Sequence, residues 1–290
     1  VIGQVYADLF PQHVRAMLLD GVVDIAADND QRNLDQTVAF EAALNRYVSN
    51  CRATSCLARD PMDAIDSLLT TAAKTPIPAP DADRPLSESG VLWALADSLY
   101  SPALAPSLTS ALSQALNGNA TRMIRLVDSY FERQGTDGPY SNLFESNIAI
   151  NCLDYASNRD PKHYEDLVPE FSKAAPTFGA WSAQSGIECA VWPVDPTPLK
   201  PPKDTGAPPI LLIGNTGDPA TPYKWAVAVS KELSTATLLT YDGSGHTAYM
   251  LALNNCINSA GDAYLLSLTL PAKGTVCGSA GITPVPPVTP

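Results

Sequence analysis

An acidic residue and a histidine each follow a short apolar segment near the end of the sequence. Asp218 comes shortly after the apolar run Ile210 to Ile213, and His246 closes the turn Asp242-Gly243-Ser244-Gly245-His246. A carboxylate that accepts a hydrogen bond from an imidazole fixes the tautomer of the ring and stabilises its protonated form. If these two side chains meet, they form a general base for a serine or cysteine nucleophile.

The segments that carry the acid and the histidine have the pattern of a strand, a helix and a second strand. The run Ile210 to Ile213 is short and bounded by Pro and Gly, which favours a buried parallel strand. Thr221-Pro222 predicts a helix start, with the Thr hydroxyl as N-cap and Pro at the first helical position. A second strand is predicted over 237–241. Since neighbouring parallel strands end at one edge of a sheet, the two polar residues are expected to meet at that edge.

Each of the two residues also has a simpler interpretation. Asp218 alone could cap the following helix, and His246 alone could be a turn residue. Their order on consecutive strand ends favours the catalytic interpretation.

The remainder of the chain divides into a sheet-forming part and a helical part. Residues 1–27 read as a helix and a strand of a sheet-forming core, 28–200 as a helical cap with a return segment, and 201–290 as the part of the core that carries the acid and the histidine. Within the helical part, Pro76 to Pro85 is predicted to be a surface connection, and 270–277 a closing loop. An all-helical block between strands of one sheet is most simply a cap over the active edge.

Helical spacing of apolar residues in the helical part predicts a core of its own. Each stripe recurs at three- and four-residue intervals, as on one face of an amphipathic helix. The stripes are Phe40, Leu44, Tyr47 and Val48; Ile65, Leu68 and Leu69; Val91, Leu95 and Leu99; and Met123, Leu126, Val127 and Tyr130.

Length, composition and charge limit the classes of function. The chain has 290 residues, 45% of them hydrophobic, which suffices for a sizeable core. Its formal net charge of −12 argues against nucleic acid and against an anionic membrane as partners, because both reward Lys and Arg. No apolar run reaches the roughly 20 residues that a membrane span needs. A soluble globular protein is therefore expected.

Six cysteines fall in three groups along the chain: Cys51 with Cys56, Cys152 with Cys189, and Cys256 with Cys277. No CxxC spacing is present and only three histidines occur, so a metal site is not expected. Disulfides in these three pairs are predicted, with six unrelated buried thiols as the alternative. Structural disulfides persist in oxidising compartments, which indicates a secreted or cell-surface protein.

Several stretches of the sequence resemble one enzyme family over nearly the whole chain. They are the opening IGQVYADLFPQHVRAMLLDGVVD, the segment AINCLDY, the loops GDPATP and GSGHTAY, and the final LPAKGTVC. They are similar to secreted α/β-hydrolases of the tripeptidyl aminopeptidase type, which are related to prolyl aminopeptidases. The resemblance implies the C-terminal part of an α/β-hydrolase sheet with a large, mostly helical inserted cap.

The same resemblance implies roles for single residues. The family order of serine, acid and histidine assigns Asp218 and His246 as the last two members of the triad. The serine would lie a few residues before Val1, so a segment upstream of this chain would be required. Serines within the chain, such as Ser141 and Ser185, lack a G-x-S-x-G context.

Recognition of a free substrate amino terminus is a further implication of the resemblance. Such a site needs carboxylates or carbonyls, and Glu145 and Asp154 lie in the cap segment that matches the family. Their alternative role is hydrogen bonding within the cap or at a helix end. The expected partner is a peptide with a free amino terminus, and no cofactor is expected.

Three functions remain open at the level of the sequence. The first is a serine exopeptidase that releases short peptides or residues from substrate amino termini. The second is an esterase or lipase, since a triad alone does not choose between amide and ester. The third is a catalytically inactive fragment or binding homologue, because the chain as given is expected to be inactive without the serine.

Overall fold

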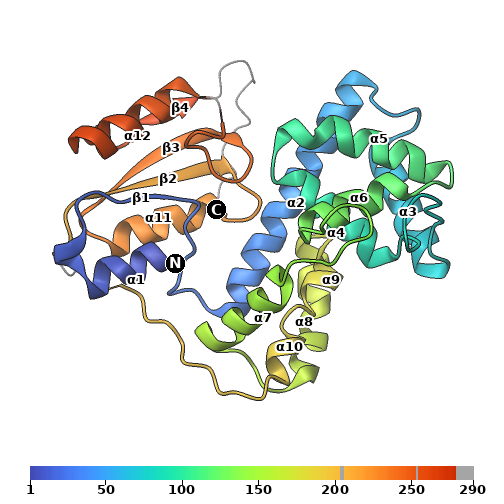
Figure 1. Cartoon of the computed structure of the whole chain (residues 1–290), viewed down its shortest axis with the longest axis horizontal. Coiled ribbons are helices and arrows are strands. Elements are labelled where there is room, and N and C mark those ends of the chain that lie inside the picture. The colour runs from blue at the N-terminus through green and yellow to red at the C-terminus, as the bar shows by residue number, and fades with distance from the viewer. Residues whose placement is uncertain (203–205, 253, 279–290) are drawn as a thin grey trace. The chain divides into compact units, whose positions relative to one another are not determined.

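The structure is a computed structural model that describes residues 1–202, 206–252 and 254–278. The chain forms two compact units. The first, here called the sheet unit, comprises Val1–Ala39 and Pro198–Pro290; the second, the helical unit, comprises Phe40–Thr197. In Figure 1 the sheet unit contains the strands together with α1, α11 and α12. The elements labelled in the helical unit are all helices.

The sheet has four parallel strands in the order β1-β2-β3-β4. β2 is the most buried of them, and β1 pairs with it in the register Leu18 to Leu211. The strands are β1 (Leu18–Asp20), β2 (Ile210–Gly217), β3 (Ala236–Ser244) and β4 (Val276–Gly278). The fold is therefore α/β, as the sequence predicts.

Alternate residues of β2 face opposite sides of the sheet, as the period of two requires. Ile210 and Leu212 pack with the apolar residues of α1 (Ile2–Leu9) and α11 (Tyr223–Glu232). Leu211 and Ile213 pack instead with those of α12 (Asn255–Ser267). Figure 1 shows the same arrangement, with α1 and α11 on one face and α12 on the other. Because both faces are covered, the strand reads as a continuous apolar run.

Two local predictions in the sheet unit were wrong. Residues 276–278 form β4, whereas the sequence predicts a closing loop there; pairing with Thr240 to Asp242 of β3 adds this short strand. The helix after the acid begins at Tyr223 with Pro222 at its N-cap, so Thr221 is not the cap residue.

The helical unit is held together by an apolar core to which its helices contribute. Of the predicted stripes, Leu44, Ile65, Leu95 and Met123 are at most 1% exposed. The helices in chain order are α2 (Asn29–Thr54), α3 (Pro61–Lys74), α4 (Glu88–Leu99), α5 (Ala105–Leu116), α6 (Thr121–Tyr130), α7 (Leu143–Asp154), α8 (Pro161–Ala174), α9 (Gly179–Ser182) and α10 (Ile187–Ala190). The first eleven residues of α2 belong to the sheet unit.

The proline-rich segment 76–85 is not purely a surface connection. Ile77 forms an antiparallel bridge with Leu86, with backbone N–H to O distances of 2.9 and 2.8 Å. Both side chains are buried in the core of the helical unit. The sequence does not predict this bridge because a single pair of extended residues is too short to show an alternating hydrophobic pattern.

Three disulfides are present, in the predicted pairing. Cys51 is bonded to Cys56, and Cys152 is bonded to Cys189, both within the helical unit. Cys256, in α12, is bonded to Cys277, in β4. The last bond fixes the added strand to the helix that covers the sheet. Within the described ranges, no helix has both the length and the hydropathy that a membrane span needs.

Candidate active site

Asp218 lies in the loop after β2, and its carboxylate is held by donors on both oxygens. Oδ1 accepts hydrogen bonds from the backbone N–H groups of Ala220 (2.9 Å) and Thr221 (2.8 Å). Oδ2 accepts from the hydroxyl of Thr221 (3.0 Å) and from the N–H of Thr247 (3.2 Å). The Thr221 hydroxyl thus bonds the acid rather than capping α11. These donors fix the plane of the carboxylate.

His246 faces this carboxylate with one ring nitrogen. Nδ1 lies 3.1 Å from each carboxyl oxygen of Asp218. A carboxylate only accepts hydrogen bonds, so Nδ1 carries the ring proton and Nε2 is the basic nitrogen. The histidine side chain is 29% exposed, whereas that of Asp218 is 1% exposed. A buried acid behind a partly exposed imidazole is the geometry of a general base that a substrate can reach.

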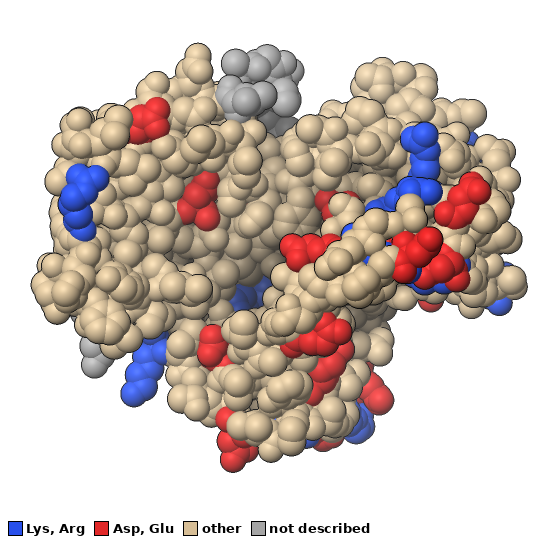
Figure 2. Space-filling model, in the orientation of Figure 1, with Lys and Arg blue, Asp and Glu red and all other residues tan. Residues whose placement is uncertain are grey.

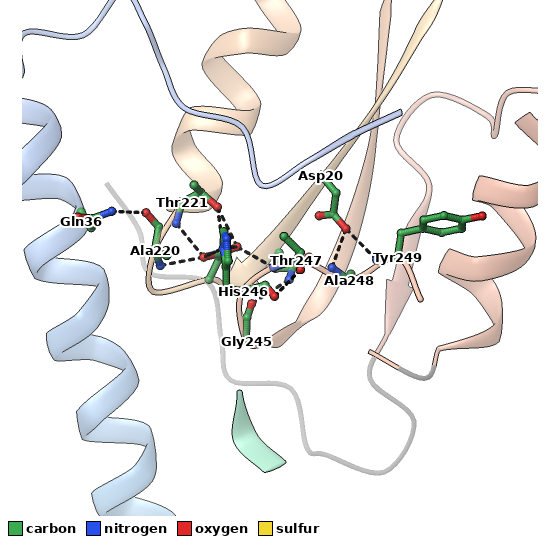
Figure 3. A network of polar contacts seen from close by, with 11 residues as sticks. Asp20, Gln36, Ala220, Thr221, Gly245, His246, Thr247, Ala248 and Tyr249 are labelled. Carbon is green, nitrogen blue, oxygen red and sulfur yellow. Dashed lines mark hydrogen bonds and ion pairs between the residues drawn. The ribbon is translucent and has the colours of Figure 1, made fainter. Parts of the chain in front are cut away.

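The backbone of the histidine loop is strained and held from several sides (Figure 3). Thr247 and Met250 have φ values of 62° and 64°, in the left-handed region that costs a non-glycine residue about 1–3 kcal/mol. Asn215 of β2, which is 1% exposed, donates from Nδ2 to the carbonyl oxygen of Gly245 (2.9 Å). Strain of this kind persists only where neighbouring groups determine the conformation.

A second carboxylate, Asp20 at the end of β1, holds the far side of the histidine loop. Its Oδ2 accepts hydrogen bonds from the N–H groups of Ala248 (2.7 Å) and Tyr249 (2.8 Å), as Figure 3 shows. Burial raises the pKa of the Asp20 carboxyl and the charge of Asp218 adds to the rise, whereas the two backbone donors oppose it. Through its bonds to the two backbone N–H groups, Asp20 fixes the position of the histidine loop.

Gly21 is required where the chain leaves β1 beside the histidine. Its φ is 72°, and a Cβ atom there would lie 3.0 Å from Cε1 of His246 and 3.1 Å from Oγ1 of Thr221. Both the backbone conformation and the close approach strain any side chain at this position. The sequence predicts Asp20-Gly21 as a strand end but does not show its contact with the histidine loop.

The N-terminal turns of α2 hold the acid loop and the helix that follows it. Gln36 donates from Nε2 to the carbonyl oxygen of Ala220 (2.6 Å). Asp35 accepts hydrogen bonds from Nε1 of Trp225 (3.1 Å) and from Nζ of Lys224 (2.7 Å). These residues are more than 180 positions apart in sequence, so sequence reasoning had no signal for them.

Glu145 and Asp154, the residues suggested for substrate recognition, both lie on α7 in the helical unit. Glu145 is exposed in the first turn and Asp154 is the last residue of the helix. Nine residues correspond to two and a half helical turns, so the two Cα atoms lie about 14 Å apart along the axis on opposite sides of the helix. The structure does not bring their side chains together at one point.

For the residues described, no group of three or more His, Cys, Asp or Glu side chains is arranged to hold a metal ion. The chemistry that this site offers is proton transfer by an oriented imidazole.

Part of the chain matches a known family model. Residues 175–277, which include both Asp218 and His246, match the family model described as TAP-like protein.

Three kinds of relatives align with almost the whole chain. Serine protease Hip1 of Mycobacterium tuberculosis is 34% identical over 295 aligned residues, which cover 95% of this chain and 55% of that protein. Carboxylesterase B of the same organism is 33% identical, with 92% and 53% covered. Tripeptidyl aminopeptidase of Streptomyces lividans is 27% identical, with 95% and 52% covered. The chain spans about half the length of the curated relatives it matches.

Proposed function

The chain belongs to the TAP-like family of serine hydrolases, and on this premise we propose that Asp218 and His246 are the acid and the base of its catalytic triad. The observation that carries the proposal is the contact of His246 Nδ1 with both oxygens of the Asp218 carboxylate. These residues follow adjacent parallel strands, at the edge where α/β sheets perform chemistry.

We propose that the nucleophilic serine precedes Val1 in the full-length protein. Support comes from the order serine, acid, histidine in α/β-hydrolases, of which the acid and the histidine are in this chain. The backbone N–H that follows the serine would contribute to the oxyanion hole and would also lie upstream. On this proposal the chain alone has no triad-dependent turnover.

The proposed reaction is acyl transfer with two proton transfers through His246. Nε2 takes the proton of the serine hydroxyl while the serine oxygen attacks the substrate carbonyl. The imidazolium that forms is stabilised by Asp218 across the 3.1 Å contact, and it returns the proton to the leaving amine. Water then hydrolyses the acyl-enzyme by the same route. No metal or organic cofactor takes part in this scheme.

The substrate that we propose is a peptide with a free amino terminus, from which the enzyme releases short peptides or single residues. Two relatives support a peptidase, one named a serine protease and the other a tripeptidyl aminopeptidase. We propose further that the helical unit serves as the cap of this hydrolase. Glu145 and Asp154 remain candidates for binding the amino terminus, but on opposite sides of α7 they can serve it only one at a time.

An esterase is the second candidate, because carboxylesterase B matches the chain at an identity of 33%. The same acid and base serve both reactions. The choice depends on the leaving group and on how the substrate is held.

Secretion or a cell-surface location is proposed from the three disulfides. Such bonds persist in oxidising compartments.

The test compares three substrates with the full-length protein that contains this chain. They are a tripeptidyl arylamide with a free amino terminus, its N-acetylated form, and a simple acyl aryl ester. An exopeptidase cleaves the first and discriminates against the second, and His246→Ala lowers kcat/KM by about 10⁴ or more. Strong ester hydrolysis without arylamide hydrolysis would establish the esterase instead. Unchanged turnover in His246→Ala would overturn the assignment of the base.

A further inference from the structure

The hydrogen bonds around the acid continue beyond Asp218 to helix α2. One of the backbone donors to Oδ1 of Asp218 is the N–H of Thr221, at 2.8 Å. The carbonyl oxygen of Ala220 belongs to the same peptide group, and in a planar trans peptide the two point in opposite directions. That oxygen accepts a hydrogen bond from Nε2 of Gln36 at 2.6 Å. One peptide group therefore lies between Gln36 and the carboxylate, bonded on both sides (Figure 3).

These contacts form a continuous chain of hydrogen bonds that ends on the imidazole. The chain runs from Gln36 through the peptide group to Asp218, and from the carboxylate to Nδ1 of His246 at 3.1 Å. All of these residues belong to the sheet unit. Hydrogen bonds in a chain polarise one another, so a donor on the carbonyl oxygen makes the N–H of the same peptide group a stronger donor. Gln36 thus acts on a group that holds the acid, although the two side chains are separated by a peptide.

The carbonyl group that Gln36 holds belongs to a buried residue. Ala220 is 5% exposed, so its carbonyl is largely shielded from water as an alternative donor. A buried carbonyl without a donor is costly, and the peptide group would rotate to find another. Because the carbonyl and the Thr221 N–H share one plane, that rotation would turn the N–H away from Asp218. Loss of the Gln36 donor should therefore be felt at the acid.

A buried carboxylate fixes the turn of α2 from which Gln36 projects. Asp35, whose side chain is 6% exposed, accepts hydrogen bonds from Nε1 of Trp225 and from Nζ of Lys224, both on α11. Nε2 of Gln31, one turn earlier on α2, donates to the same carboxylate at 2.7 Å. These bonds hold the turn to α11, so the Gln36 side chain starts from a fixed backbone.

We propose that Gln36 is a positioning residue of the active site, which holds the peptide group between Ala220 and Thr221 in the orientation that fixes Asp218 and, through it, His246. The inference rests on the proposed roles of Asp218 and His246 as acid and base. Gln36 has no contact with the substrate in this scheme and acts on the rate through the acid alone.

Variants of the full-length protein test this role, with whichever of the arylamide and the ester the parent hydrolyses. Gln36→Met keeps the length of the side chain and removes its donor, so we expect kcat to fall about tenfold with KM within about twofold of the parent. Gln36→Lys supplies a donor again and should return kcat to within about threefold of the parent.

The matched control is Lys224→Met, because it also removes one side-chain hydrogen bond of α2. Its Nζ bonds Asp35, which lies outside the chain from Gln36 to Asp218. We expect kcat of this variant to stay within about twofold of the parent.

A double-mutant cycle separates action through the acid from a general structural role. In an Asp218→Asn background, Gln36→Met should change kcat by no more than about twofold, because the carboxylate through which it acts is gone. A structural role would lower kcat about tenfold in that background as well.

Proton NMR follows the same chain without turnover. The Nδ1–H resonance of His246, identified by its loss in His246→Ala, should move upfield in Gln36→Met and stay in place in Lys224→Met. An unchanged kcat, an unchanged resonance or an equal fall in kcat in the Asp218→Asn background would overturn the role of Gln36. Turnover that survives His246→Ala would instead overturn the proposed acid and base, and the resonance alone would then decide whether Gln36 holds Asp218.

Discussion

The sheet unit and the helical unit use their buried polar groups in different ways. In the sheet unit, Asp20, Asn215 and Asp218 come from different strands or loops, and all three bond to the short loop 245–249. In the helical unit, the buried Ser98 hydroxyl donates to a carbonyl of its own helix, and Glu41 accepts from the backbone N–H groups that begin the turn at Thr177. The first pattern fixes the geometry of one side chain, and the second satisfies backbone groups within a helix and at a turn.

The two units also differ in their surface charge. On the face shown in Figure 2, charged side chains are sparse over the sheet unit and denser over the helical unit. Because the buried polar groups of the sheet unit hold the histidine loop, their substitution should act mainly on rate. Substitutions in the apolar core of the helical unit should act mainly on stability.

The largest expected effect is on turnover, from Asp218→Asn. The amide that replaces the carboxylate has one acceptor oxygen in place of two, so it cannot accept both the Nδ1–H of His246 and the donors that now hold the carboxylate. The imidazole then loses the tautomer in which Nε2 is basic. We expect kcat to fall about 10⁴-fold in the full-length protein. The control is Asp242→Asn, whose carboxylate bonds the Thr216 hydroxyl (2.9 Å) and should matter only a few-fold. Steady-state kinetics on the arylamide measure kcat of both variants. A fall in kcat of less than about tenfold in Asp218→Asn would contradict the role of the buried acid in the sheet unit.

The second effect is on stability, from Leu95→Ala in the core of the helical unit. Leu95 is fully buried, and truncation of such a residue costs about 2–5 kcal/mol of the free energy of unfolding. Urea denaturation measures this cost, and kcat of the folded fraction should stay near that of the parent. Leu266→Ala, at a site 80% exposed, is the control and should change stability little. A large fall in kcat with unchanged stability would contradict the assignment of this core to stability.

The third effect separates two disulfides within the helical unit. Cys152 and Cys189 are 37 residues apart, whereas Cys51 and Cys56 are 5 apart. In the chain-entropy model, removing the longer link costs about 4 kcal/mol and removing the shorter about 2 kcal/mol. Paired Cys→Ala variants in thermal unfolding should show this order, and the reverse order would show that native-state contacts outweigh loop length.

A smaller effect on rate is expected from Asp20→Ala, which leaves the N–H groups of Ala248 and Tyr249 without their acceptor. The histidine loop then loses its hold on β1, and we expect kcat to fall about 10- to 100-fold with KM little changed. Asp20→Asn keeps an acceptor oxygen and should recover part of the loss. If KM rose while kcat stayed constant, Asp20 would act on substrate binding instead.

The smallest effect concerns pH and Asp97, a partly buried carboxyl group on α4. Its pKa of about 6 in the folded protein exceeds the ordinary value of 3.8, so between these values the folded state binds more protons than the unfolded state. Stability therefore falls as pH rises from about 4 to 6, and Asp97→Asn removes that part of the fall. After allowance for solvent access, we expect a gain of about 1 kcal/mol at pH 7.5 and none at pH 4. Urea titrations at both pH values test it, and an equal change at both would refute the role of the charge.

The strands that precede Asp218 and His246 follow from the sequence because their signals are local. A short apolar run bounded by Pro and Gly predicts β2, and the turn ending in Gly245-His246 marks the end of β3. The pairing of the six cysteines also follows, because partners are neighbours in chain order.

Other parts of the site could not be predicted because they depend on pairs of residues far apart in the chain. Asp20 contacts the histidine loop across 228 residues, and Gln36 reaches the acid loop across 184. No propensity or period reports such contacts. The sequence predicts a helix cap at Thr221 because Thr hydroxyls commonly cap helices, whereas this hydroxyl donates to Asp218.

The pairing of β1 with β2 has a consequence for how the protein folds. Leu18 pairs with Leu211, so the whole helical unit is synthesised between the two strands. Closing a flexible loop of that length is slow, because the chain loses conformational entropy before the contacts between β1 and β2 can form. If the helical unit folds first, a compact body replaces the flexible loop and the closure becomes easier. The histidine loop, anchored to Asp20 across 228 residues, would then order only after β1, the helical unit and β3 have all been synthesised.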